Sequence, residues 1–458
     1  MDGSELSNSP MEGVDIHGKH DYKLFKLLIA ACFSLYTAMM CAKSVFVAEL
    51  VTFIAQTGVD KVTASLANTY YFITYAVVQV FLAFFMNKLN VRRYLVVTVP
   101  VAAVCGIAVA FAGNDIVLIW VLFAIQGAFQ AGIYAGCMYV LSTYLPQSLV
   151  SVGNGFMQGG FAIGNTVAYI ISAIFVALGA WRVPYVFFGI VFLCATVFFG
   201  VVTAKVAKKY PHVKTHRENS VKDLKETHEH DSELFFNRGL FTFKNNGQKA
   251  LFYVLSVLYS VIATALYYAV NNWVGNYLKE VFGFTDSVSI IISVVVPIMS
   301  FFGPIMAIAY SKKHKNYIKS SVLFALIPLI AAGIMIFAYD FNAVIAVIVV
   351  AAFIVGTKML TGLQSVATFD MRTELNTGSY TAMVNAAASV SAGIAPTIVG
   401  KIIEDLNNSS SVGDTVGKAG WLFQFVNAAV IGAFLLLFMA IVYFLTKRKT
   451  NLNQEKLY

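Results

Sequence analysis

Charge is scarce in this sequence. Only 12% of its 458 residues are charged, whereas 59% are hydrophobic, and a soluble domain usually carries roughly 25% charged residues. This composition predicts an integral membrane protein. No strand-like alternation with short turns recurs along the chain, so an α-helical bundle is favoured over a transmembrane barrel.

The residues that membrane enzymes and metal sites need are also sparse. All five cysteines lie in apolar segments, which predicts no disulfide framework. The seven histidines lie in tails and loops, so none can be an intramembrane proton relay. The HEH run at 228–230 could bind a metal but is better explained as a solvated linker. The sequence contains no GxxxxGK[ST] motif, so it does not indicate transport driven directly by ATP. We expect no enzyme activity, no cofactor and no metal.

Apolar segments long enough to cross a bilayer recur along the chain. There are twelve, near residues 26–54, 62–86, 94–113, 116–144, 150–178, 183–206, 250–278, 286–311, 318–338, 341–369, 380–404 and 420–446. We therefore predict an all-α membrane protein with two pseudo-symmetric six-helix bundles. Such an arrangement places a substrate site near the membrane midplane, between the bundles.

Charged and polar stretches divide the chain around these spans. Residues 207–249 predict a cytoplasmic linker between an N-terminal bundle at 26–206 and a C-terminal bundle at 250–446. Residues 1–25 and 447–458 predict cytoplasmic tails, the first of them disordered and without the basic start of a signal peptide.

The distribution of basic residues predicts the orientation. With the N-terminus inside, 25 of the 32 Lys and Arg residues lie in cytoplasmic tails and loops, and five lie in outer loops. Cytoplasmic loops are enriched in Lys and Arg, so both termini are expected in the cytoplasm of a cell-membrane protein. The net charge of +9 is spread over several inner segments. It therefore reflects topology, and no nucleic-acid partner is expected.

Four stretches resemble the major facilitator superfamily of transporters, and the likeness extends from about residue 25 to 446. Within it, the chain is most similar to the organophosphate:phosphate antiporter branch, which includes glycerol-3-phosphate and hexose-phosphate transporters. The stretches are SLYTAMMCAKSVF at 34–46, AFFMNKLNVRRYL at 83–95, GAFQAGIYAGC at 127–137 and LYYAVNNWVGNYLKEVFGF at 266–284. The resemblance implies alternating access, with helices 1, 4, 7 and 10 lining a central cavity.

The residues that the resemblance places at the substrate differ in part from that branch. Lys43 stands at the position of a helix 1 arginine, whereas Tyr267 replaces a second arginine in helix 7 and Gln79 replaces a helix 2 lysine. The expected phosphate-binding pair is thus incomplete. A phosphate ester and a carboxylate both remain open as the solute, since lysine suits either anion.

Two lysines fall near the middle of predicted spans, whereas the other basic residues lie at span ends or in tails and loops. Lys43 and Lys358, on the first and tenth spans, each lie within roughly 5 Å of the middle of the helix. A charge at the bilayer centre costs about 2.5–3.5 kcal/mol on insertion scales. Two ammonium groups facing one cavity also repel each other, and an anion between them removes both costs. We therefore predict that both lysines bind an anionic solute.

The alternative is that fixed carboxylates neutralise these lysines. Glu49 is the one acidic residue clearly within a span, six residues beyond Lys43 and on a different helix face. Asp370 is twelve residues from Lys358, too far to pair along one helix. Fixed pairing therefore lacks partners.

Neutral polar residues on the same helices are expected to complete the site. The predicted substrate-binding residues are Lys43, Lys358, Tyr36, Gln130, Tyr134, Tyr267, Asn271, Asn272 and Thr361. Tyr75, Gln79 and Gln158 are weaker candidates. Each neutral residue taken singly is more often explained by an interhelical hydrogen bond than by a ligand contact.

The sequence thus predicts a monomeric secondary active transporter for a small organic anion. Exchange against another anion and coupling to protons both remain open. A solute receptor or sensor with the same fold is the alternative, and only a transport assay separates the two. A channel is disfavoured because rings of charge and repeated pore motifs are absent.

Overall fold

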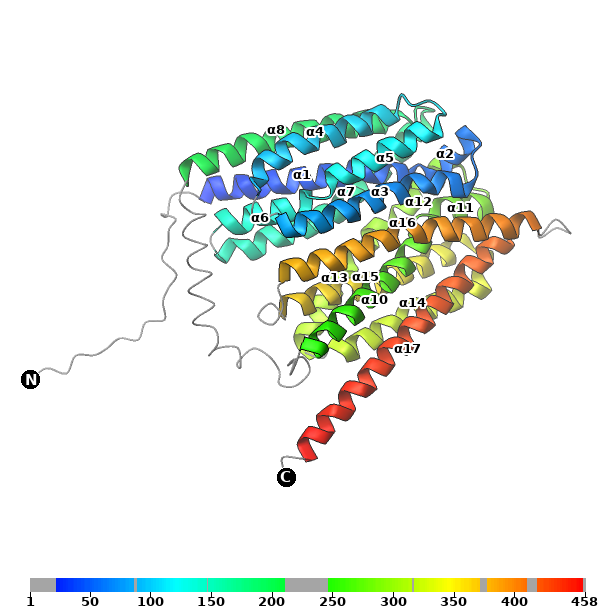
Figure 1. Cartoon of the computed structure of the whole chain (residues 1–458). Helices are drawn as coiled ribbons and strands as arrows, with labels where there is room; N and C mark the ends of the chain where they lie inside the picture. The colour runs from blue at the N-terminus through cyan, green and yellow to red at the C-terminus, as the bar shows by residue number, and fades with distance from the viewer. Residues whose placement is uncertain are drawn as a thin grey trace, which may run out of the picture.

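The computed structural model describes residues 22–85, 89–145, 147–210, 246–314, 317–370, 377–409 and 418–455. Every regular element in these ranges is a helix (Figure 1). Eleven helical segments among the described residues are long and apolar enough to cross a membrane. The predicted all-α membrane fold is therefore confirmed.

The described helices form two groups, one on each side of residues 211–245. The first half contains α1 Tyr22–Ala48, α2 Leu50–Thr57, α3 Lys61–Phe85, α4 Val91–Val109, α5 Ile116–Gln130, α6 Ile133–Tyr144, α7 Gln147–Ala177 and α8 Val183–Lys209. The second half contains α10 Asn246–Asn271, α11 Val274–Phe282, α12 Asp286–Ser293, α13 Val295–His314, α14 Tyr317–Ala338, α15 Ala343–Asp370, α16 Thr377–Ser409 and α17 Ala419–Glu455. In Figure 1 the first half is blue to green, and the second half is green to red.

One predicted span, at 62–86, forms a helix that is not among the eleven apolar segments. This helix, α3, has 25 residues and is long enough to span. Polar side chains such as Asn68, Thr69 and Gln79 lower its hydropathy. α3 nevertheless packs between α5 of its own half and α16 of the other half. Its polar residues are thus turned toward protein, which is where a membrane helix tolerates them.

The ends of the predicted segments differ modestly from the observed helices. Most of the predicted linker at 207–249 and of the predicted tail at 1–25 lies outside the described residues. The predicted tail at 447–458 is helical as far as Glu455, because α17 continues beyond its apolar part. The division into two domains and a linker stays a prediction.

Four predicted spans are interrupted, although the sequence predicts each as one helix. The interruptions lie at Glu49 between α1 and α2, at residues 131–132 between α5 and α6, at residues 272–273 between α10 and α11, and at Val294 between α12 and α13. Irregular backbone is tolerated at membrane depth only where protein or a cavity surrounds it. Each interruption is in fact packed inside the bundle, since Glu49 and Asn272 are both buried.

Two close helix contacts hold the predicted lysine helices in place. A Cβ atom on Gly164 of α7 would lie 2.6 Å from Met40 Cβ of α1, and one on Gly303 of α13 would lie 2.5 Å from Lys358 Cβ of α15. Small residues allow such backbones to approach closely in a membrane. Glycine therefore brings α7 against α1, which carries Lys43, and α13 against α15, which carries Lys358.

The two halves meet at the end of the bundle where α2 and α11 lie, hereafter the α2/α11 end (Figure 1). Lys61 at the start of α3 forms an ion pair of 3.0 Å with Glu280 of α11. The Thr69 hydroxyl of α3 donates to the Gly393 carbonyl of α16 at 2.7 Å. These contacts cross between the halves, so this end is closed.

Candidate functional site

A pocket lies between the two halves. It is lined by α1, α3 and α7 of the first half and by α10 and α13 of the second. Its empty volume is about 410 Å³, counting its open mouth. The pocket lies at the interface of the halves, the region where the sequence predicts a substrate site.

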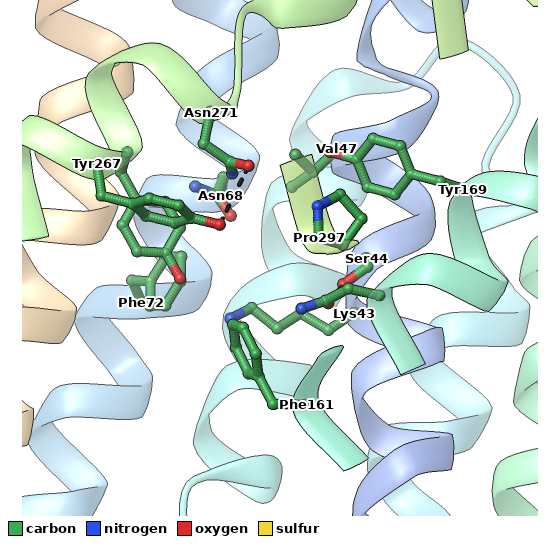
Figure 2. Close-up of a pocket in the computed structure, with 12 residues that line it drawn as sticks. Lys43, Ser44, Val47, Asn68, Phe72, Phe161, Tyr169, Tyr267, Asn271 and Pro297 are labelled. Carbon is green, nitrogen blue, oxygen red and sulfur yellow. Dashed lines mark hydrogen bonds between the residues drawn. The ribbon is translucent and has the colours of Figure 1, made fainter. Parts of the chain in front are cut away.

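Five aromatic side chains form much of the pocket wall. They are Phe72 of α3, Phe161 and Tyr169 of α7, and Tyr267 and Tyr268 of α10. Figure 2 shows Tyr267 and Phe72 on one side of the space and Tyr169 on the other. Both halves of the protein thus contribute rings to one pocket.

Lys43 extends from α1 into this pocket (Figure 2). Its ammonium nitrogen lies 4.2 Å from the centre of the Phe72 ring and 5.4 Å from that of Tyr71. Both distances fall within the range of a cation–π contact. In the described part of the chain, Lys43 forms no ion pair with a carboxylate.

Lys358 approaches the same aromatic wall from α15. Its ammonium nitrogen lies 3.6 Å from the centre of the Tyr267 ring, 5.1 Å from Phe161 and 6.0 Å from Tyr268. All three rings line the pocket. Lys358 also has no ion pair among the residues that the structure describes.

Glu49 does not neutralise either lysine. It is wholly buried at the break between α1 and α2 and lies near Tyr185 of α8. The Ser172 hydroxyl of α7 lies close to this carboxyl group, but among the described residues neither carboxylate oxygen forms a hydrogen bond of good geometry. The fixed pairing that the sequence leaves open as an alternative is therefore not seen for Lys43 and Glu49.

Two amines without a carboxylate partner among the described residues thus meet at one pocket. A cation–π contact stabilises a desolvated ammonium by about 2 kcal/mol or more, whereas burial of an unpaired charge costs several kcal/mol. The aromatic rings therefore offset only part of the cost for Lys43 and Lys358. A bound anion would offset the rest.

Hydrogen bonds already occupy several polar groups of the pocket wall. The Ser44 hydroxyl of α1 donates to Asn165 Oδ1 of α7. The Tyr267 hydroxyl lies 3.3 Å from Asn271 Oδ1 and 3.1 Å from the Ser300 hydroxyl. Asn68 of α3 differs, because its buried Nδ2 has no partner among the described residues. It is a spare donor at the pocket.

The structure brings four of the predicted site residues to the pocket. Lys43, Tyr267 and Asn271 line it, and Lys358 contacts its rings. Asn272 lies just behind, where its side-chain oxygen accepts a hydrogen bond of 3.0 Å from Asn271 Nδ2. Their role in substrate binding stays a prediction.

The other predicted residues lie away from this pocket. Tyr36 and Tyr134 pack together, with 5.1 Å between ring centres. Gln130 is wholly buried, and its side-chain oxygen accepts from the Tyr71 hydroxyl at 2.7 Å. The Thr361 hydroxyl donates to the Lys358 carbonyl oxygen at 3.2 Å. Helix 4 of the resemblance, here α5 and α6, thus contributes no residue to the described lining.

The weaker candidates are also outside the lining. Tyr75 stacks on Tyr71 with 6.0 Å between ring centres, and Gln79 is buried on α3. The side chain of Gln158 is not among those the structure describes.

Sequence reasoning missed the contributions of α3, α7 and α13. On α7, Phe161, Asn165 and Tyr169 are spaced four apart and line the pocket together. On α3, Asn68 and Phe72 have the same spacing. Residues four apart share a helix face. A search for faces that combine an amide with aromatic residues would have selected these positions.

A comparison with protein families finds one match over most of the chain. The family described as Major Facilitator Superfamily matches residues 28–396. No curated protein sequence matches the chain.

Solved structures show the same fold at low sequence identity. A bacterial homologue of the human lysosomal transporter Spinster, inward-facing and occupied, has a TM-score of 0.67 and 12% identity, over 93% of this chain and 98% of that one. A D-xylose–proton symporter has a TM-score of 0.65 and 13% identity, over 91% and 97%. The nucleoside transporter NupG has a TM-score of 0.62 and 13% identity, over 91% and 100%. These likenesses show the fold alone.

Proposed function

The chain belongs to the major facilitator superfamily, and we propose that it is a secondary active transporter for a small organic anion. The observation that carries this proposal is the pair Lys43 and Lys358. The two ammonium groups come from opposite halves, contact rings of one pocket and have no carboxylate partner in the described part of the chain. A solute with one or more negative charges complements that pocket.

The position of the two lysines suits alternating access. In this process two bundles rock around a substrate site at their interface and expose it to each side in turn. An anion held by one lysine from each half would contact both moving parts. The closed α2/α11 end, with its Lys61–Glu280 ion pair, then represents one of the two end states.

The orientation of the chain follows from its basic residues. Their concentration in tails and loops on the side of the termini supports cytoplasmic termini and a cell-membrane location. In that orientation the α2/α11 end faces outward, and the structure is closed to the outside. We further propose that one chain suffices for transport, because the two halves supply both lysines.

The driving force is exchange against another anion or coupling to protons. The organophosphate:phosphate antiporter likeness favours exchange. Lys43 stands where that branch has an arginine, but Tyr267 stands at its second arginine and contacts Lys358 instead. Lys358 would thus supply from α15 the second charge that α10 lacks.

Binding measurements with lysine variants test the anion site. We would measure dissociation constants of the purified chain for inorganic phosphate, glycerol phosphate, succinate and benzoate. A charge-assisted hydrogen bond is worth about 1.5–3 kcal/mol, so Lys43→Gln and Lys358→Gln should each weaken the best ligand by about 10- to 100-fold. Lys401→Gln, at an exposed position of α16, is the matched control and should bind as the wild type does.

Counterflow into proteoliposomes tests transport itself. Vesicles loaded with the anion that binds most tightly should accumulate the same labelled anion from outside. Binding that depends on both lysines but produces no counterflow would instead assign a receptor. Normal binding of every anion by both lysine variants would contradict the anion site.

A further inference from the structure

We infer that the solute of this pocket is a single-ring aromatic carboxylate, with its carboxylate between Lys43 and Lys358 and its ring against the aromatic wall. This inference rests on the proposed function and specifies its substrate. It narrows the choice between phosphate ester and carboxylate that the lysines alone leave open.

The first argument is the composition of the wall. Five of the pocket's lining residues are Phe or Tyr, contributed by α3, α7 and α10. Aromatic pairs prefer offset or edge-to-face packing with ring centres about 4.5–7 Å apart, and such pairs stabilise a complex beyond the area they bury. A ligand ring between Phe161 and the α10 tyrosines would meet rings on more than one side. An aliphatic chain of equal size would gain only its burial.

The second argument is that the two lysine nitrogens lie over ring faces of the pocket wall. Lys358 Nζ lies over the Tyr267 ring and Lys43 Nζ over the Phe72 ring. A carboxylate that attracts both ammonium groups would draw them from these rings, because a full negative charge attracts a cation more strongly than a ring quadrupole does. The ring faces would then be free to pack against the apolar part of the same ligand. Binding of the ligand's carboxylate to the lysines therefore favours packing of the ligand's ring against the wall.

The third argument concerns hydroxyl groups. A sugar or glycerol phosphate carries several hydroxyls, each of which needs a partner when it is buried. The polar groups of Ser44, Asn165, Tyr267 and Asn271 already bond to one another or to neighbouring side chains. Of the remaining polar groups, Asn68 Nδ2 is a donor, and Tyr169 and Tyr268 each bring one hydroxyl to the wall. Few polar groups of the wall are therefore left for a ligand with several hydroxyls.

The fourth argument concerns the anionic group. Phosphate recognition commonly uses the bidentate fork of arginine, and no arginine is found among the described residues that line the pocket. Two lysines and one amide provide point donors, which are sufficient for the two oxygens of a carboxylate.

The test compares two carboxylates with six-membered rings, one aromatic and one saturated. Calorimetry on the purified full chain would measure benzoate and cyclohexanecarboxylate, with phenyl phosphate and glycerol phosphate alongside. We expect benzoate to bind about three- to tenfold more tightly than cyclohexanecarboxylate, the range of one or two ring contacts. Phe161→Leu should remove this preference. Phe156→Leu, an exposed residue of the same helix, should leave it unchanged.

The outcomes separate this inference from the proposed function. If benzoate and cyclohexanecarboxylate bind equally, or if phenyl phosphate binds more tightly than benzoate, the aromatic carboxylate is wrong. If anion binding in that same experiment still depends on Lys43 and Lys358, the proposed anion transporter stands. If no anion binds, or if binding ignores both lysines, the inference and the proposed function are both wrong. The comparison of benzoate with cyclohexanecarboxylate uses the wild-type protein alone, so it tests the inference even if a variant fails to fold.

Discussion

Phe72 of α3 and Tyr268 of α10 pack edge to face across the boundary between the halves, with 5.4 Å between ring centres and 75° between ring planes. Lys43 Nζ lies over the first ring, and Lys358 Nζ lies 6.0 Å from the centre of the second. Each lysine thus contacts one ring of an aromatic pair, and the two rings of this pair come from different halves. Movement of one half against the other changes the surroundings of both charges together.

The ion pair at the α2/α11 end provides a first prediction about that movement. Lys61 of α3 and Glu280 of α11 are 3.0 Å apart, and both side chains are partly exposed. Partly exposed ion pairs contribute about 0.2–1 kcal/mol. Lys61→Gln should therefore shift the population toward a state open at this end, by about two- to fivefold. Spin labels on cysteines introduced at Gln56 of α2 and Val288 of α12, with the five native cysteines replaced, would report the change in distance between these two positions.

A second ion pair in the same region is the control. Lys279 of α11 and Asp286 of α12 are 2.7 Å apart, and both belong to the second half. Lys279→Gln removes a comparable ion pair that does not cross between the halves. Its distance distribution should match that of the wild type. An equal shift in both variants would contradict the role of Lys61 in closure.

Much of the fold could be predicted from the sequence because a bilayer allows few solutions. Spanning backbone must be helical, and apolar length therefore reveals each span. The predicted 183–206, for example, corresponds to α8 at Val183–Lys209. Lys43 and Lys358 were visible for the complementary reason, since a charge in an apolar segment is rare.

The helix breaks and most of the pocket wall could not be predicted. The break before Trp273 depends on tertiary packing, because this buried side chain donates from Nε1 to the Pro396 carbonyl of α16 at 2.9 Å. Phe72 and Phe161 are two of 38 phenylalanines in the chain. Hydropathy cannot distinguish a phenylalanine that faces lipid from one that faces a pocket. That difference depends on which helices from the two halves become neighbours.

The contact between α7 and α1 provides a prediction about the shape of the pocket. A Cβ on Gly164 would lie 2.6 Å from Met40 Cβ and 2.7 Å from the Thr37 carbonyl oxygen. Gly164→Ala should therefore push α7 away from α1 and destabilise the protein by about 1–3 kcal/mol. It should also weaken anion binding, because Phe161 and Asn165 lie on the same helix. Thermal unfolding and calorimetry would measure the two effects.

A second glycine of α7 is the matched control for this prediction. A Cβ on Gly159 would meet no atom within 4 Å. Gly159→Ala should be neutral or should stabilise the protein, because alanine favours a helix over glycine by about 1 kcal/mol. Equal destabilisation by both substitutions would show that overpacking against α1 is not the cause.

The buried carboxyl group of Glu49 provides a prediction about stability. Its oxygens form no hydrogen bond of good geometry among the described residues, and the nearby Ser172 hydroxyl can bond to an amide as well as to a carboxyl group, so a neutral side chain of the same shape should be tolerated there. We expect Glu49→Gln to keep or raise the free energy of unfolding, by up to about 2 kcal/mol. Gln126→Glu makes the opposite change at a buried position of α5 and should lower the free energy of unfolding. Loss of stability in Glu49→Gln would indicate a partner for the carboxylate.

The two pocket lysines should show opposite effects on stability and on binding. Each is held by aromatic rings and has no ion pair in the described ranges, so the empty protein carries an uncompensated cost. Lys43→Met or Lys358→Met should therefore raise the free energy of unfolding without ligand by about 1–3 kcal/mol, while anion affinity falls. The two gains should not add, because removing one charge also relieves the repulsion felt by the other. Thermal unfolding of the two single variants and the double variant, with and without benzoate, would test this. A fall in stability without ligand would show that the rings offset the charges in full, and an anion would then not be needed to explain the pocket.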